Sequence, residues 1–464
     1  MTTAAHRIHR LLGRVVAIEA HEVQATLLGF AWFCCLLAGY YLLRPLRDAL
    51  GLVGGPQELR WLFTATFVTM LLLVPVFGLL VTRLPPRRFV PYAYRFFALT
   101  LLGFSALLAL RLDSVWLARS FFVWVSVFNL FIVSIFWSVL DDCFSSAQGR
   151  RLFGFIAAGG TLGTVIGPLL AATAVSLFGP MVLALLAALL LELALRCFRG
   201  IYPHAAQADG GGPEVGARSR PLGGQMWAGL SLIARSPYLL GICAYLLLHT
   251  AASTFLYFEQ ARIVADALPD TASRTRYFAG VDFCVSCLTL ALQIVVTGRL
   301  MRRWGLVICL ALLPVVTVAA FGALALAPTL AMLAVVQVGR RALDYAIARP
   351  AREVLFTVVS REEKYKAKNA IETLVYRGGD ALSGWLSSVL TAVGVGLGGI
   401  ALLAIPMAAA WCVLCVWLGR RQQGLSQASL PQPSLPQESL PQESLPKQSS
   451  LDAAPVRAIL PEKS

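Results

Sequence analysis

Charged residues are scarce in this chain of 464 residues, of which only 14% are Asp, Glu, Lys or Arg. Soluble globular domains contain about 25% charged and about 45–50% apolar residues, whereas 58% of this chain is hydrophobic. This deficit excludes an ordinary soluble domain. Apolar runs long enough to cross a bilayer, which takes about 20 residues per helix, recur from about Gln24 to Leu418. The sequence therefore predicts an all-α polytopic membrane protein.

Three chemical signatures are also missing. No Gly-x-x-x-x-Gly-Lys-[Ser/Thr] sequence could cradle the phosphates of ATP, so we expect no enzyme and no catalytic residue. The ten cysteines fall mostly inside apolar runs, as buried thiols do, and lack the further ligands and polar surroundings of a metal site. A cleavable signal with a small-residue cleavage site is not expected either. We predict no metal and no cofactor.

The net charge of +15 does not indicate nucleic acid, which would require a basic stripe on a soluble domain. The cations lie instead in the gaps between apolar runs, and alternate gaps hold 27 and 8 Lys and Arg residues. Cytoplasmic loops carry the excess of positive residues, so both termini are predicted to be cytoplasmic. Richness in Ala and Arg is typical of a GC-rich bacterial genome, which indicates the bacterial cytoplasmic membrane.

The apolar runs predict about twelve spans, near residues 24–43, 60–82, 89–110, 117–140, 153–176, 178–199, 237–259, 278–300, 304–326, 328–348, 372–394 and 397–418. Residues 1–23 have the spacing of an amphipathic helix on the cytoplasmic membrane surface. Bundles of six helices are predicted at 24–200 and 237–420, with a Gly-rich cytoplasmic linker at 201–236. The Ser-Leu-Pro-Gln repeats of 421–464 predict a disordered cytoplasmic tail.

Two landmarks recur with almost the same offset, which indicates duplication of a six-span unit. The glycine of Gly78-Leu-Leu-Val-Thr-Arg83 returns as Gly298 of Gly298-Arg-Leu-Met-Arg302 (298 − 78 = 220), and Gly159-Gly160 returns as Gly378-Gly379 (378 − 159 = 219). Two pseudo-symmetric six-helix bundles around a central substrate site resemble the major facilitator superfamily. The Gly78 segment is similar to the signature loop of that superfamily.

A second set of glycines, Gly160, Gly163 and Gly167, could be mistaken for a dinucleotide-binding loop. No strand precedes them, and small residues at this spacing form one ridge on a helix. We therefore predict close packing of this helix against a neighbour.

Charged residues inside or at the edge of spans are costly in lipid and therefore indicate function. Arg44 and Arg47 share a helix face with Tyr40 and Tyr41 one turn back, on the cation-poor side, and Arg377 interrupts an apolar span. Guanidinium groups bind carboxylate or phosphate bidentately. The predicted substrate-binding residues are Tyr41, Arg44, Arg47, Arg352 and Arg377. The predicted coupling or ion-pairing residues are Asp48, Glu259, Asp282, Glu353, Glu372 and Asp380.

Purely structural roles would also explain several of the charged and aromatic residues in the spans. Arg340, Arg341 and Arg349 are expected to anchor the cytoplasmic end of a span, because the positive-inside bias alone accounts for them. The tyrosines are explained equally well by an interfacial aromatic belt.

Several motifs resemble the non-mitochondrial ATP/ADP carrier family of plastids and intracellular bacteria. They are Arg44-Pro-Leu-Arg47-Asp48, Phe136-Trp137 through Gly167, Ala348-Arg-Pro350-Ala-Arg352-Glu353, Lys364-Tyr-Lys366-Ala-Lys368-Asn-Ala-Ile371-Glu372 and Arg377-Gly-Gly379. The resemblance implies nucleotide exchange, with charged residues in these spans holding phosphates. Arg47 falls on a family lysine, whereas Asp380 replaces one, and the acid expected early in span four has no counterpart in residues 123–129. The resemblance therefore implies a divergent bacterial member of the family.

The primary hypothesis is a secondary transporter of a small organic anion, such as a nucleotide or phosphorylated metabolite, acting by alternating access as a monomer in the lipid bilayer. In the empty transporter, Asp48, Glu353, Glu372 and Asp380 would pair with the arginines or carry a proton. One alternative is a proton-coupled exporter of amphipathic compounds. Another is a non-transporting membrane sensor or assembly protein that uses residues 360–368 and the tail.

Overall fold

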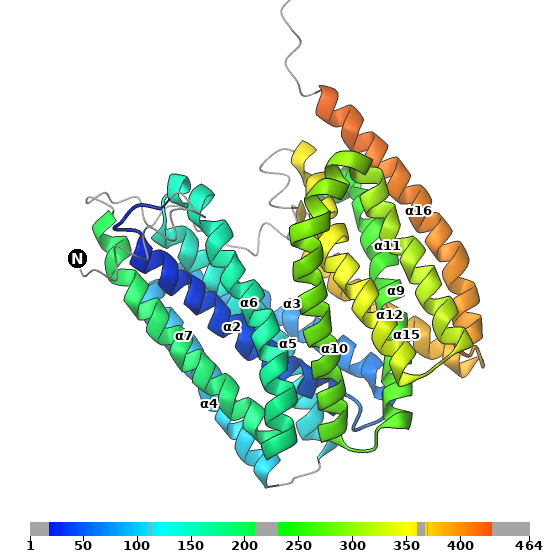
Figure 1. Ribbon diagram of the computed structural model, residues 1–464, viewed down its shortest axis with the longest axis horizontal. Coiled ribbons are helices and arrows are strands. Elements are labelled where there is room, and N and C mark those ends of the chain that lie inside the picture. Colours follow the sequence, from blue (N-terminus) through cyan, green and yellow to red (C-terminus); the bar gives the residue numbers. More distant parts are fainter. Residues whose placement is uncertain (1–17, 111–113, 209–230, 360–366, 369, 429–464) are drawn as a thin grey trace, which may run out of the picture.

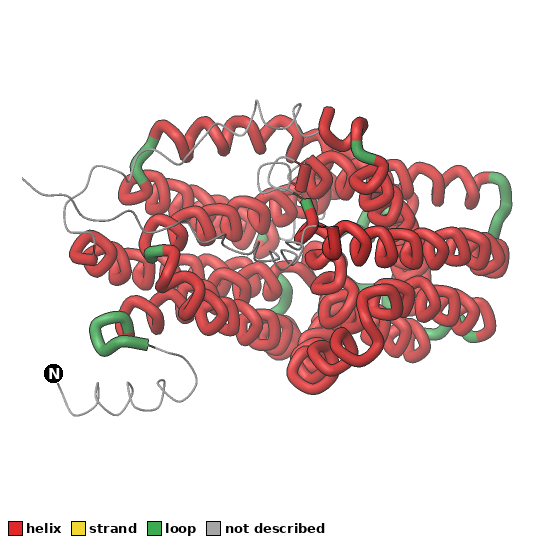
Figure 2. The backbone as a smooth tube through the Cα atoms, turned by 90° about the horizontal axis from the view of Figure 1, so that it is seen from above, coloured by secondary structure: helices red, strands yellow, loops and turns green. Residues whose placement is uncertain are grey.

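A computed structural model describes residues 18–110, 114–208, 231–359, 367–368 and 370–428. Across these residues the chain is helical with short connecting loops and contains no strand (Figure 2). The first half contains α2 (Val23–Leu50), the short η1 (Pro56–Glu58), α3 (Leu59–Arg83), α4 (Pro86–Ala109), α5 (Val115–Cys143), α6 (Ser146–Phe178) and α7 (Met181–Ala208).

The second half contains α9 (Pro237–Ala267), α10 (Thr271–Leu292), η3 (Gln293–Thr297), α11 (Gly298–Leu326), α12 (Leu330–Leu343), η4 (Asp344–Ala348), α13 (Arg349–Leu355), η5 (Phe356–Val358), η6 (Ile371–Val375), α15 (Tyr376–Ala392) and α16 (Leu397–Ala428). The segments η3, η4 and η6 are single π-helical turns. They continue the helices on either side of them, so α10–η3, α12–η4–α13 and η6–α15 each form one long rod.

The described helices make twelve membrane crossings. Nine stretches are long and apolar enough to span a bilayer by length and composition, and one of these, Thr271–Leu326, is double. Gly305 has φ +76° and ψ 176° inside it, a backbone conformation that side-chain-bearing residues rarely adopt, and reverses the chain. The two remaining crossings, through η4 and η6, carry several charges each. Twelve crossings in two bundles confirm the predicted fold class.

Helix ends are fixed by local sequence. Ser145 caps α6 by accepting a hydrogen bond from the Gln148 N–H, and the Gln148 side chain accepts one from the Ser145 N–H, a capping box. Gln148 and Arg151 also bond the buried carboxylate of Glu22 at the start of α2. Burial by itself raises the pKa of Glu22, but these bonds and the backbone N–H of Glu19 lower that pKa below its usual 4.5.

The predicted glycine ridge packs α6 against α2. A Cβ added at Gly159 or Gly163 would collide with the carbonyl oxygen of Phe30 or Cys34, and one at Gly167 would lie 2.6 Å from that of Ala38. Only glycine allows the two backbones to approach this closely. The glycine pair of the second half, Gly378-Gly379, also allows close helix packing, since a Cβ on Gly379 would lie 2.6 Å from the Thr250 hydroxyl of α9. Both observations agree with the predicted duplication.

The two bundles meet at one face of the molecule and separate toward the other (Figure 1). We call the face that holds the start of α2 and the end of α16 the terminal face, and the opposite one the distal face. At the distal face, buried side chains of both halves form one cluster, which includes Leu52, Leu62 and Phe122 with Phe255 and Phe321. Trp385 of α15 adds a hydrogen bond across the halves, from Nε1 to the Thr64 hydroxyl of α3 at 3.0 Å.

Several predicted boundaries differ from the observed ones, because helical hydrogen bonding continues past the first charge. The helix α2 continues to Leu50, α7 to Ala208 and α16 to Ala428, where apolar runs end near residues 43, 199 and 418. The span predicted at 328–348 extends to Leu355 across η4. The amphipathic segment 1–17, most of the linker and residues 429–464 of the tail lie outside the described residues.

The extended span places four cations inside a helix rather than in a loop, namely Arg340, Arg341, Arg349 and Arg352. The same holds for Arg44 and Arg47 of α2. When the four arginines of the extended span are left out, the Lys and Arg count of the first set of alternate gaps falls from 27 to 23 (27 − 4). When Arg44 and Arg47 are left out, the count of the second set falls from 8 to 6 (8 − 2). The bias that predicts cytoplasmic termini is therefore unchanged.

Candidate functional site

A buried ion-pair group joins the two bundles. Asp282 of α10, with only 3% of its side chain exposed, pairs with Arg341 of α12 at 2.6 Å. Its second oxygen lies 3.7 Å from Nε of Arg44, which comes from α2 in the other half. Two arginines therefore share one carboxylate across the interface. Both arginines keep part of their surface accessible, 16% for Arg44 and 12% for Arg341.

A second group lies one turn further along α2. Arg47 pairs with Asp48 at 2.6 Å, and Asp48 accepts a hydrogen bond from the hydroxyl of Tyr257 on α9 at 3.0 Å. The Arg47 guanidinium also stacks on Phe122 of α5, 5.0 Å from the ring centroid. Tyr41 lies under the Arg44 guanidinium at 5.5 Å. The predicted residues of α2 thus face the second bundle.

These charges lie deep in the membrane. Asp282 is 11 residues from the start of α10 at Thr271, and Arg341 is 11 residues from the start of α12 at Leu330. At a rise of 1.5 Å per residue this is about 16 Å from the distal face, near the middle of a hydrocarbon core about 30 Å thick. Helical side chains tilt toward the N-terminus, so Arg44 extends from the end of α2 back to this level.

A third group lies within the second bundle. Asp344, the first residue of η4, is 3.6 Å from Nε of Arg349 and 3.9 Å from Nε2 of His249 on α9. The neighbouring Arg340 is buried and donates a hydrogen bond to the Ser253 hydroxyl at 3.1 Å, while its Nε has no hydrogen-bond partner among the described residues. Single π turns are rare and often occur at functional sites.

The last members come from α15. Asp380 accepts a hydrogen bond from the Thr254 hydroxyl of α9 at 3.3 Å. Arg377, one turn earlier, lies beside the Tyr376 ring at 5.9 Å, and no carboxylate of the described residues comes within ion-pair distance of it. We call all ten charged residues of these groups the central cluster. They are Arg44, Arg47, Asp48, Asp282, Arg340, Arg341, Asp344, Arg349, Arg377 and Asp380.

The central cluster has more cations than anions. Among the described residues it contains six arginines and four aspartates, an excess of two positive charges (6 − 4 = 2). Unbalanced charge in a low-dielectric interior is unfavourable. The excess is concentrated on Arg340 and Arg377, which have no carboxylate partner in the part of the chain that the structure describes, and on Arg44, which shares one. An anion at this position would remove the imbalance.

Four of the predicted charged site residues lie outside the central cluster. Glu353 and Glu372 do not pair with the arginines as expected; both face Lys368, at 2.8 and 4.0 Å, and are about half exposed. Glu259 pairs with Arg262 at 3.2 Å, nearer the distal end of α9. Arg352 is half-buried in α13, beyond Arg349. Glu353, Glu372 and Arg352 come from the rods that carry the central cluster but from different turns, whereas Glu259 comes from α9, which contributes no member to it.

Other residues were missed or assigned differently from sequence. Arg341 and Arg340 are not membrane-surface anchors, because their span continues past them and their partners are buried. His249 was not singled out, since a lone histidine in an apolar run is unremarkable until its neighbours are known. The one available signal was Asp344, an acid within an apolar stretch.

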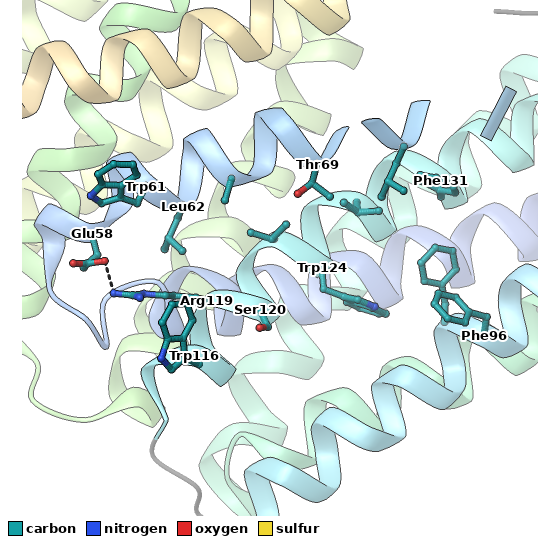
Figure 3. A pocket seen from close by; sticks show the side chains of 15 residues that line it. Glu58, Trp61, Leu62, Thr69, Phe96, Trp116, Arg119, Ser120, Trp124 and Phe131 are labelled. Carbon is teal, nitrogen blue, oxygen red and sulfur yellow. Dashed lines mark hydrogen bonds and ion pairs between the residues drawn. The ribbon is translucent and has the colours of Figure 1, made fainter. Parts of the chain in front are cut away.

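A separate pocket lies in the first bundle (Figure 3). It has a volume of about 890 Å³ and lies between α3, α4 and α5. One end carries the Glu58–Arg119 ion pair at 2.6 Å, and the far end is aromatic, with Phe96 and Phe131. Between them the indole N–H of Trp124 is buried, and no described residue accepts a hydrogen bond from it. This pocket is amphipathic and is lined by one acidic and one basic residue, whereas the central cluster has more cations than anions.

No known family model matches the chain, and no curated protein matches it in sequence. Solved structures are nevertheless similar. A bacterial homologue of the iron transporter ferroportin in an inward-facing state has a TM-score of 0.59 at 13% identity, with 87% of this chain and 98% of that chain covered. An auto-inhibited peptide transporter of the POT family has a TM-score of 0.58 at 14% identity, with 86% and 96% covered.

A nucleoside transporter, NupG, has a TM-score of 0.53 at 13% identity, with 87% of this chain and 99% of that chain covered. The alignment thus includes almost the whole length of each of these proteins. The chain has a major-facilitator-like fold. This likeness concerns the fold alone, because the identities are low, and the substrate must be argued from the residues. In such a fold, the region between the two bundles at mid-membrane is the usual substrate position, and here Arg44, Arg341 and Asp282 of the central cluster lie there.

Proposed function

We propose that this protein is a secondary transporter that moves a small organic anion across a bacterial cytoplasmic membrane by alternating access. The observation that supports this most directly is the excess of two positive charges in the central cluster, whose members Arg44, Arg341 and Asp282 lie at mid-membrane between the bundles. Arginine is the residue best suited to bind carboxylate or phosphate in such a site, because its planar fork makes two parallel hydrogen bonds.

The arrangement of the bundles supports alternating access. The two bundles pack together through the distal cluster and diverge at the terminal face (Figure 1). With cytoplasmic termini, this conformation faces the cytoplasm. Rocking of one bundle against the other would break the Trp385–Thr64 contact and open the distal face. Arg44 and Asp282 come from opposite bundles, so the contact between them changes during that motion.

The anion class is narrowed by the sequence motifs. The segments from Arg44 to Asp48 and from Arg349 to Glu353 resemble the ATP/ADP carrier family, and both contribute to or adjoin the central cluster. We therefore propose a nucleotide or a phosphorylated metabolite as the substrate. Asp380 in place of a family lysine lowers the positive charge of the site by two units, which favours an anion of smaller charge than ATP.

Uptake by liposomes tests this function. Purified protein is reconstituted and supplied with labelled nucleotides, sugar phosphates and dicarboxylates, and we expect saturable uptake of at least one of them. Replacing Arg44, Arg47 or Arg377 with Ala removes a charged hydrogen bond of about 1.5–3 kcal/mol, so apparent affinity should fall about 10- to 150-fold. Arg196→Ala is the matched control, because Arg196 is 74% exposed on α7 and should behave as wild type.

Uptake that is indifferent to all three substitutions would exclude these arginines from the substrate site. A second function, export of amphipathic compounds, is favoured by the pocket between α3, α4 and α5 (Figure 3), whose charged and aromatic ends suit such molecules. Saturable efflux of a neutral or cationic dye from the same liposomes, without any anion flux, would select it instead.

A further inference from the structure

We propose that His249 and Asp344 form a proton-binding site that couples a proton to the anion. This inference rests on the proposed anion transport and adds the coupling ion to it. The site lies in the second bundle, between α9 and the π turn η4. Its working principle is competition between His249 and Arg349 for one carboxylate.

The histidine is in an unusual environment. Only 3% of its surface is exposed, and its ring packs against Trp411 and Tyr376, with centroids 5.8 and 6.3 Å away. Nδ1 is buried without a hydrogen-bond partner, and Nε2 faces Asp344 at 3.9 Å, beyond hydrogen-bond distance. A histidine with a purely structural role normally has both nitrogens satisfied, because an unpaired buried polar atom is costly. Here neither nitrogen is bonded among the described residues.

The carboxylate is shared. Arg349 Nε and His249 Nε2 both lie closest to the same oxygen of Asp344, at 3.6 and 3.9 Å. The side chain of Arg349 is 47% exposed and its guanidinium stacks on Tyr345 at 4.4 Å. The guanidinium is thus only partly held and can turn to another anion. When His249 is neutral, Arg349 is the ion-pair partner of Asp344.

Protonation reverses this preference. A proton taken from water forms a second N–H bond on the imidazole, and the resulting imidazolium pairs with Asp344. Arg349 is then free to bind the transported anion, and the central cluster together with the protonated His249 carries an excess of three positive charges (2 + 1 = 3). Release of the anion reverses each step and returns the proton to water. No bond other than the N–H bond forms or breaks.

The surrounding charges make the two binding events interdependent. The cations that face the pair are Arg340 on α12 and Arg349 and Arg352 on α13, and the other ionisable groups are Tyr376 on α15, Tyr345 on η4 and Tyr245 on α9. The three cations repel an imidazolium when no anion is present. An anion neutralises them and so favours protonation, and by linkage the proton favours the anion to the same extent.

The experiment measures His249 directly. The chain has five histidines, so labelling with ¹⁵N-histidine in the full-length protein, with His249→Gln for assignment, resolves this ring by NMR. We expect ADP, or inorganic phosphate as a second probe, to shift the titration of His249 to higher pH and to leave the other four unchanged. Probe binding to wild type should strengthen toward tenfold per pH unit of acidification across the titration. With His249→Gln or Asp344→Asn this dependence should fall below about twofold.

Each outcome separates the two proposals. Probe binding that keeps its full pH dependence in His249→Gln, or a His249 signal unaffected by bound probe, overturns the coupling site and leaves anion transport intact. If neither probe nor any anion of the liposome panel binds, both proposals are overturned. His249→Gln preserves size and hydrogen-bonding capacity, so retained binding at fixed pH shows that the variant is folded.

Discussion

The carboxylate of Asp282 offers the sharpest test of the central cluster. It pairs with Arg341 at 2.6 Å and lies 3.7 Å from Arg44, and its side chain is 3% exposed. Asp282→Asn keeps the shape but leaves two buried arginines with no carboxylate. Removing one partner of a buried ion pair costs about 3–5 kcal/mol. We therefore expect a clear loss of stability in the empty transporter.

The stability that Asp282→Asn is expected to lose can be converted to a change in melting temperature, Tm. A loss of 1 kcal/mol lowers Tm by about 2–4 °C in a domain of 150–250 residues, which is the size of one bundle here. A loss of about 3 kcal/mol thus predicts a decrease of about 6–12 °C. The assay is thermal denaturation of the detergent-solubilised protein, followed by loss of the monodisperse peak on size-exclusion chromatography.

Two further variants make the test specific. Asp282→Asn combined with Arg341→Gln removes one charge of each sign and should recover at least half of the lost Tm. Glu192→Gln on α7 is the control, since the Glu192–Arg196 pair is 3.9 Å long and 40% and 74% exposed, and such pairs contribute about 0–1 kcal/mol. A Tm of Asp282→Asn within about 1 °C of wild type would refute the view that this carboxylate offsets buried cations.

Two other predictions concern packing and pH. Gly159→Val places a side chain against the Phe30 carbonyl of α2 and should destabilise the protein by about 3 kcal/mol. The control is Gly154→Ala, which meets open space and should leave Tm unchanged. Equal Tm values of the two variants would contradict the packing of α6 on α2. Glu22, whose pKa is lowered by its bonds to Glu19, Gln148 and Arg151 against the effect of burial, should stabilise the fold at pH above 4.5, and this contribution is lost as pH falls through the lowered pKa. Glu22→Gln should therefore lower Tm more at pH 7 than at pH 3, and equal shifts at both pH values would show that ionisation of Glu22 is irrelevant.

The predicted positions of the helices were accurate where apolar runs are bounded by turn residues. The segments Gly54-Gly55-Pro56, Pro85-Pro86 and Gly179-Pro180 lie between helices, as their backbone preferences require. The repeat of Gly159-Gly160 and Gly378-Gly379 also predicted a real similarity, since both sites pack on the first helix of their bundle. In these cases the determining interactions are local, or depend only on residue size.

Predictions based on single charges were less accurate, because a charge has the same appearance in sequence whether it ends a span or lies inside one. Arg340 and Arg341 were expected at the membrane surface but lie about 16 Å from the distal end of their rod. Glu353 and Glu372 were expected to pair with arginines but face Lys368. The three π turns, which aim some of these side chains, have no recognisable sequence pattern.

The sequence by itself determined that this chain crosses a membrane about twelve times and that arginines enter the spans, and it predicts that the two halves are related. These properties follow from composition, hydropathy and spacing, which are set one residue at a time. Only the tertiary structure decided that Arg44 and Arg341 share Asp282 and that His249 and Arg349 share Asp344. Partners that are up to 238 residues apart (282 − 44) are chosen by how the helices pack, and burial then makes each pairing energetically decisive.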